Sequence, residues 1–135
     1  MARITRIIPL LVYEDIPAAH DFLVKAFGFT PGGVDYNKEG RPVHAEVSAG
    51  DLMIWIHRVT ADHDLASQRS MGPASSGLVV HVDDVDAHYE RARAYGAHIE
   101  SEPKDTDYGQ REYGVRDPEG HRWWFATPLT QPARV

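Results

Sequence analysis

The chain has 135 residues, of which 42% are hydrophobic and 25% are charged, with no cysteine and a formal net charge of −6. This composition predicts one soluble globular domain, and no run of about 18 apolar residues is present that would span a membrane. The lack of cysteine excludes disulfides and thiolate metal sites, and the acidic balance without a basic cluster argues against nucleic acid as a partner. We expect a cytoplasmic protein.

Two stretches of the chain align with each other without a gap. They are "DIPAAHDFLVKAFG" (15–28) and "DDVDAHYERARAYG" (83–96). Each begins with an acidic residue suited to an N-cap, has apolar or small residues at helical spacing, and ends in a glycine suited to a left-handed C-cap. Each also follows an apolar run, 7–12 or 77–82. Both stretches are therefore predicted to be helices that come after a strand.

Short strand-like segments separated by turn signals follow each predicted helix. They lie at 29–36, 41–48 and 51–58 in the first half and at 97–102, 110–116 and 121–127 in the second. The sequence thus predicts an α+β fold built from two β-α-β-β-β modules in a single domain, 1–135. Module 1 spans about 4–58 and module 2 spans 77–128. The linker, 59–76, is long for a compact domain, so it either crosses between the modules or acts as a lid.

The predicted strands alternate between simple aliphatic side chains and a mixed set. In 52–57, for example, Leu52, Ile54 and Ile56 share one face while Met53, Trp55 and His57 share the other. We expect the aliphatic face to lie under the helices. The mixed faces carry histidine, glutamate, arginine and tryptophan, a composition that suits the lining of a ligand site.

The repeated module, the segment D-I-P-A-A-x-x-F-L-x-x-x-F-G-F (15–29) and the closing Y-G-x-R-x-Y-x-V-x-D-P-E-G-H-x-W (108–123) resemble the vicinal oxygen chelate superfamily. This superfamily includes glyoxalase I, bleomycin-resistance proteins and extradiol dioxygenases. The resemblance covers residues 4–128. It implies that the sheets of the two modules curl together around one cleft, which is often completed in a homodimer.

The metal-dependent members of that superfamily bind a divalent ion with His, Glu or Gln side chains from the first and last strands of each module. Carried over to this sequence, those positions fall at about Ile8, Trp55, Gly77 and Trp124. None of these side chains offers a lone pair to a metal, and shifting the register by one residue brings in no ligand either. The usual metal site is therefore predicted to be absent, and we predict no cofactor.

The resemblance and the alternation together place Trp123 under a helix and Trp124 in the cleft, where Trp55 would join it. Aromatic faces of this kind would stack on a planar or cationic molecule, as in the drug-binding members of the superfamily. Alternatively, both tryptophans fill a barrel mouth or a dimer interface. Arg111 either meets an anionic group of the ligand or braces a strand end through Glu112 or Asp117. The full set of candidate ligand-binding residues is His44, Trp55, His57, His81, Arg111, Arg122 and Trp124.

Two functional classes follow. In the first, the protein is a homodimer that binds a small aromatic or polycyclic molecule without chemistry. In the second, it is a lyase, isomerase or dioxygenase of the glyoxalase type. Such an enzyme would use one divalent metal at a relocated site made by His44, Glu46 and His81, or acid–base catalysis by Glu46 or Glu112 with His81. The missing metal ligands favour binding, and whether the protein is an enzyme stays open.

Overall fold

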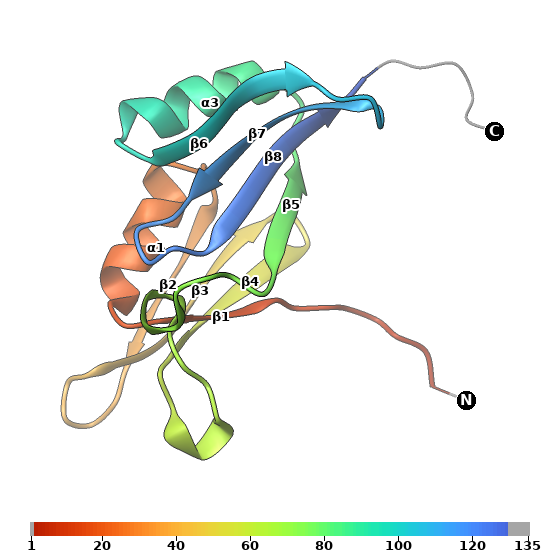
Figure 1. Cartoon of the computed structure of the whole chain (residues 1–135). Helices are drawn as coiled ribbons and strands as arrows, with labels where there is room; N and C mark the ends of the chain where they lie inside the picture. The colour runs from red at the N-terminus through yellow and green to blue at the C-terminus, as the bar shows by residue number, and fades with distance from the viewer. Residues whose placement is uncertain (1, 130–135) are drawn as a thin grey trace.

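The computed structural model describes residues 2–129, which form two modules of the same build (Figure 1). The elements of the first are β1 (Leu10–Tyr13), α1 (Ile16–Lys25), β2 (Thr30–Tyr36), β3 (Pro42–Ala49) and β4 (Leu52–Arg58). Those of the second are β5 (Gly77–His81), α3 (Val85–Ala94), β6 (His98–Asp105), β7 (Gln110–Arg116) and β8 (Arg122–Pro128). A 3-10 turn, η1 (Ala61–His63), and the short helix α2 (Gln68–Met71) lie between the modules. The predicted α+β repeat is confirmed.

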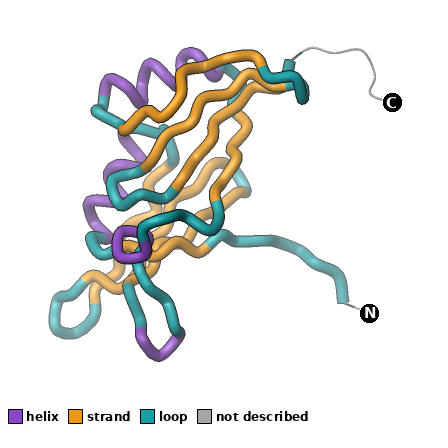
Figure 2. Tube along the Cα trace, viewed as in Figure 1, coloured by secondary structure: helices purple, strands orange, loops and turns teal. Residues whose placement is uncertain are grey.

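Each module forms its own four-stranded mixed sheet. The strand orders are β1-β4-β3-β2 and β5-β8-β7-β6, with β1 parallel to β4, β5 parallel to β8 and every other pair antiparallel. Figures 1 and 2 show α1 and α3 on the same side of the molecule. Within residues 2–129, neither α1 nor α3 covers the opposite face of either sheet, which is called the uncovered face below (Figure 1). Among the described residues, no helix is long and apolar enough to cross a membrane.

The first strand is shorter than the apolar run 7–12 predicts. β1 begins at Leu10, so Ile8 precedes the strand, contrary to the expectation that placed it inside. Pro9 explains the difference, because proline has no N–H to give to a sheet. Its carbonyl still accepts a 2.9 Å hydrogen bond from the Trp55 N–H, which aligns the chain just before β1 begins.

Both main helices have an aspartate N-cap, but in the second helix it is Asp84 and not Asp83, the residue that the ungapped repeat aligns with Asp15. The Asp15 carboxylate accepts a 3.1 Å bond from the Ala18 N–H, and the Asp84 carboxylate accepts one of 3.1 Å from the Ala87 N–H. These bonds satisfy N–H groups that have no partner within the helix. Gly28 and Gly96 follow the helices at φ of 85° and 80°, a backbone conformation that glycine adopts without a steric penalty.

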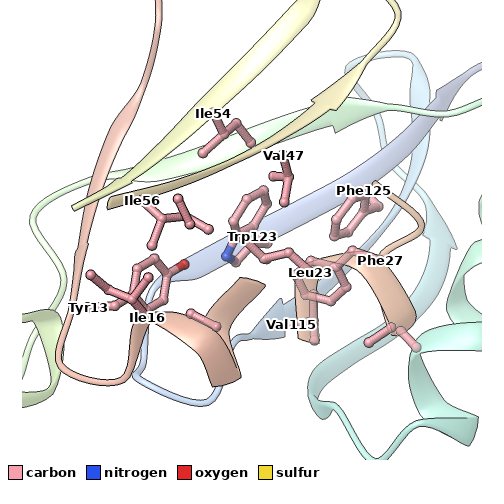
Figure 3. Close-up of a cluster of buried hydrophobic side chains, with 14 of the residues drawn as sticks. Tyr13, Ile16, Leu23, Phe27, Val47, Ile54, Ile56, Val115, Trp123 and Phe125 are labelled. Carbon is pink, nitrogen blue, oxygen red and sulfur yellow. The ribbon is translucent and has the colours of Figure 1, made fainter. Parts of the chain in front are cut away.

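One hydrophobic core is shared by both modules (Figure 3). Val47, Ile54 and Ile56 of the first sheet belong to the same buried cluster as Trp123 and Phe125 of the second. The end of α1 joins them, because the Phe27 ring lies 5.3 Å from the Trp123 ring and 4.7 Å from that of Phe125. Trp123 and Phe125 are fully buried, which confirms that their face is the one under the helices.

The turn before β8 ties the two modules and the linker together. Buried Asp117 accepts hydrogen bonds from the Tyr13 hydroxyl and from Trp123 Nε1, while buried Glu119 accepts the N–H groups of Glu14 and Asp15 at 2.7 and 2.8 Å. Burial, and then the neighbouring Asp117 carboxylate, hold the pKa of Tyr13 well above its ordinary value. The hydroxyl therefore stays a donor.

The linker is anchored at the same place. Ser67 donates a 2.5 Å hydrogen bond to the Glu14 carboxylate, and Arg69 lies 3.4 Å from Glu14 and 4.0 Å from Glu119. The segment 59–76 thus crosses from β4 to β5 while its helix α2 is held against the end of β1.

Candidate functional site

The uncovered face of the second sheet is centred on Trp124. Its indole lies over two glycines on the strands to either side of β8. A Cβ added at Gly77 would come within 2.4 Å of Trp124 Cζ3, and one at Gly114 within 3.3 Å of Trp124 Nε1. The ring therefore lies across β5, β8 and β7 because neither neighbouring strand has a side chain there. Val79, opposite Trp124 in the β5–β8 register, is 59% exposed and extends the apolar floor.

An acidic group stands at one end of this face. Glu112 is opposite Ala126 in the β7–β8 register, two residues before Gly114 on β7 and two residues after Trp124 on β8. Its Oε1 accepts hydrogen bonds from the Tyr108 hydroxyl at 2.6 Å and from Gln110 Nε2 at 2.9 Å. His81 Nε2 lies 3.1 Å from Gln110 Oε1, so His81 fixes the orientation of the amide that binds Glu112.

A basic group lies over the central ring itself. The Arg122 guanidinium lies over the Trp124 ring, 4.8 Å from its centroid, in cation–π geometry. Glu100 holds both Arg122 and Arg116, with nitrogen–oxygen distances of 2.9 and 2.8 Å. Burial alone would raise the pKa of Glu100, but Arg116 and Arg122 outweigh that effect and lower it.

The uncovered face of the first sheet carries a second aromatic group. Trp55 is 38% exposed, lies opposite Glu46 in the β3–β4 register, and packs edge-on against His44 with ring centroids 5.4 Å apart. His57 follows on the same strand and is 3.1 Å from the hydroxyl of Thr60. Partial burial, followed by the neighbouring His63 and His44, lowers the pKa of His57, so the neutral ring is favoured.

A cavity of about 350 Å³ lies between the two sheets and touches both uncovered faces. Met53, whose sulfur accepts a 3.1 Å bond from Trp55 Nε1, lines one wall, while Val79 and His81 line the other. Phe29 and Ile54 form part of its apolar surface. Neither Trp55 nor Trp124 lines this cavity, but Met53 belongs to the Trp55 face and Val79 and His81 to the Trp124 face.

Of the predicted ligand-binding residues, Arg111 is placed elsewhere. It lies on the helix-facing side of β7, where Nε is 3.1 Å from Asp86 and Nη1 is 3.1 Å from Asp105. Of the two roles considered for Arg111, the structure has the brace, but its partners are Asp86 and Asp105 and not Glu112 or Asp117. Arg111 is therefore removed from the candidate site.

The alternative metal set is not brought together in one chain. His44 and Glu46 lie on β3, whereas His81 lies on β5 of the other sheet. Within residues 2–129, no group of three or more His, Asp or Glu side chains is arranged to hold a metal ion. Of the candidate acid–base pairs, Glu112 and His81 are connected, through Gln110, while Glu46 is on the first sheet.

Sequence reasoning missed Tyr108, Gln110 and Glu100. Tyr108 lies in the turn between β6 and β7, and Gln110 is the first residue of β7. Alternation along the strands therefore gave no signal for either of them. Gly77 and Gly114 did carry a signal. Gly114 lies within β7 and Gly77 is the first residue of β5, and a glycine in a strand is typical of a place where another group approaches the backbone closely.

Comparison with known proteins agrees with this architecture. Residues 3–125 match the Glyoxalase/Bleomycin resistance protein/Dioxygenase superfamily. The chain belongs to this superfamily. An uncharacterized protein from Mycobacterium bovis, Mb0911c, is 31% identical over 128 residues, which cover 91% of this chain and 83% of that protein.

Two solved structures show the likeness in three dimensions. TioX from Micromonospora sp. ML1 is 32% identical with a TM-score of 0.74, covering 93% of this chain and 99% of TioX. TnmS3, an antibiotic binding protein from Streptomyces sp. CB03234, is 26% identical with a TM-score of 0.72, covering 95% of this chain and 98% of TnmS3. This superfamily member thus shares its fold over nearly its full length with a protein that binds an antibiotic.

Proposed function

We propose that the protein binds a planar aromatic small molecule on the uncovered sheet faces and acts by binding rather than by catalysis. The observation that carries this proposal is the position of Trp124. Its indole lies over Gly77 and Gly114 and is partly exposed on the uncovered face. The superfamily resemblance puts Trp124 at a position where we expect the metal-dependent members to have a metal-binding side chain. Stacking on such a ring is worth about 0.5 to 1.5 kcal/mol beyond the area it buries.

Two further observations support binding. Trp55, which the resemblance puts at another expected metal-ligand position, has a partly exposed indole, and residues of both uncovered faces line the apolar cavity between the sheets. A site with apolar walls and a few polar groups at its edges is the usual arrangement for small-molecule recognition. The antibiotic-binding activity named for TnmS3 agrees with this class of function.

The test is a fluorescence titration with acridine, a planar and neutral aromatic probe. We expect acridine to quench tryptophan emission. The Trp124→Ala variant should weaken binding by about 1 to 3 kcal/mol, the loss of one buried aromatic contact. Tyr95→Ala is the matched control, because Tyr95 is 57% exposed just after α3 and away from both uncovered faces. Equal acridine affinity in the wild type and Trp124→Ala would overturn the proposal, as would the absence of binding by the wild type.

A further inference from the structure

Glu112 is a half-buried carboxylate with only one of its oxygens in use. Both of its side-chain donors, the Tyr108 hydroxyl and Gln110 Nε2, bind the same atom, Oε1. Oε2 has no side-chain hydrogen-bond donor among the described residues. A carboxylate can accept several hydrogen bonds, and those from charged donors are about twice as strong as neutral ones. Oε2 is therefore a strong acceptor that no described side chain uses.

No lysine or arginine of the described residues forms an ion pair with this carboxylate. Lys104 is opposite Glu112 in the β6–β7 register, yet no ion pair within 4.0 Å joins them in the described part of the chain. The three arginines of the second sheet are bound elsewhere: Arg111 by Asp86 and Asp105, and Arg116 and Arg122 by Glu100. The negative charge of Glu112 is thus left for a group from outside the chain.

The acidic and basic side chains of this face lie at different positions along the strands. Glu112 and Arg116 are four residues apart on β7, which places their backbones about 13 Å apart at the usual rise per strand residue. Trp124 lies between the two ends, opposite Gly114. Because the Arg122 guanidinium lies over the Trp124 ring, a flat molecule stacked on the exposed part of the indole would lie beside that guanidinium and extend toward Glu112. A positive group is repelled by Arg122 and attracted by Glu112.

We infer that the ligand is a planar aromatic cation whose amine or other N–H⁺ group binds Glu112 Oε2 while its ring stacks on Trp124. Tyr108 and Gln110 hold the carboxylate in place, and His81 holds Gln110. This inference rests on the proposed binding function and names the chemical class of its ligand.

The experiment compares two dyes of similar shape, proflavine, which is a cation at neutral pH, and acridine, which is neutral. Wild-type protein should bind proflavine more tightly than acridine in fluorescence titrations at low ionic strength. Glu112→Gln keeps the size of the side chain and removes its charge. It should weaken proflavine binding about tenfold, as expected for the loss of a hydrogen bond to a charged group, and leave acridine binding within about twofold.

A matched control removes the same charge elsewhere. Glu39 is exposed in the turn between β2 and β3, so Glu39→Gln tests whether any loss of negative charge weakens proflavine binding. The inference requires this control to bind proflavine as the wild type does. Proflavine binding that is equal in Glu112→Gln and wild type overturns the inference, as does an equal loss in both variants.

The two proposals fail in different ways. If acridine binds and depends on Trp124, but proflavine gains nothing from Glu112, the ligand class is wrong and the binding function stands. If neither dye binds the wild type, the proposed function itself is wrong.

Circular dichroism of Glu112→Gln checks that the variant is folded as the wild type is, and Tyr108→Phe gives an independent variant. Removing the Tyr108 donor should weaken proflavine binding by a smaller factor than Glu112→Gln does.

Discussion

Trp123 and Trp124 are neighbours in sequence with different environments. Trp123 is fully buried, packs against Phe27 and Phe29, and donates from Nε1 to Asp117, whereas Trp124 lies on the uncovered face. We predict that Trp123→Ala lowers the free energy of unfolding by about 3 to 5 kcal/mol, because it leaves a cavity in the shared core. Trp124→Ala should cost clearly less in urea-induced unfolding. The opposite order would contradict the assignment of the two faces.

His88 gives the fold a predictable pH response. Its Nε2 lies 2.7 Å from the Phe27 carbonyl, its Nδ1 lies 2.7 Å from the Tyr113 hydroxyl, and its ring stacks on Phe125. The neutral ring fits both bonds, with Nε2 donating to the carbonyl and Nδ1 accepting from the hydroxyl. Burial lowers the pKa of His88, and this exceeds the opposing effect of the Phe27 carbonyl; Arg91 lowers the pKa further.

Because the folded-state pKa of His88 is depressed, the unfolded chain takes up its proton first as the pH falls. The stability contribution is therefore complete above the unfolded value of about 6.5 and is lost as the pH falls through the lower folded value. We expect thermal unfolding of the wild type to shift to lower temperature over this range, and His88→Gln to reduce the shift. His98→Gln, at an exposed histidine on β6, should leave it unchanged; an equal slope in His88→Gln and wild type would exclude this role.

At the scale of the strands, Gly77 determines how β5 meets the Trp124 ring. A methyl group there would stand 2.4 Å from Trp124 Cζ3, so the ring must move. We predict that Gly77→Ala weakens binding of a planar dye several-fold while the sheet still forms, since alanine costs little in a strand. Ser76→Ala, one residue earlier and also exposed, is the control. Near-ultraviolet circular dichroism should register the displaced indole in Gly77→Ala alone.

The order of the elements and the two faces of each strand could be predicted from the sequence, because both depend on local signals. Asp15, Gly28 and their counterparts in the second module mark the helix ends, and the alternation around Trp123 assigns the buried side. The pairing of Arg111 with Asp86 could not be predicted, since it joins β7 to a helix 25 residues away along the chain. The same holds for Tyr108, whose hydroxyl reaches Glu112 only because of how the β6–β7 turn folds.

At the scale of the whole molecule, apolar surface is left open along one side of a single chain. Ile4 and Ile7 are 86% and 82% exposed, Leu52 is 74% exposed, and β5 is an edge strand whose Val79 is 59% exposed. Unpaired edges and apolar patches of this kind are commonly covered by a second copy, and a symmetric pair covers both copies at once. We therefore predict a homodimer in which this surface is buried.

Light scattering tests this prediction directly. The wild type should have twice the chain mass of 15.1 kDa at micromolar concentrations. Ile7→Glu should shift the equilibrium toward the monomer, because a charge buried without a partner opposes association. Met71→Glu adds the same charge at a side chain that is 62% exposed on α2, outside the surface in question, and should stay dimeric. A wild-type mass of one chain across that concentration range would show that the apolar surface is open in solution, and that a bound ligand is covered by one chain alone.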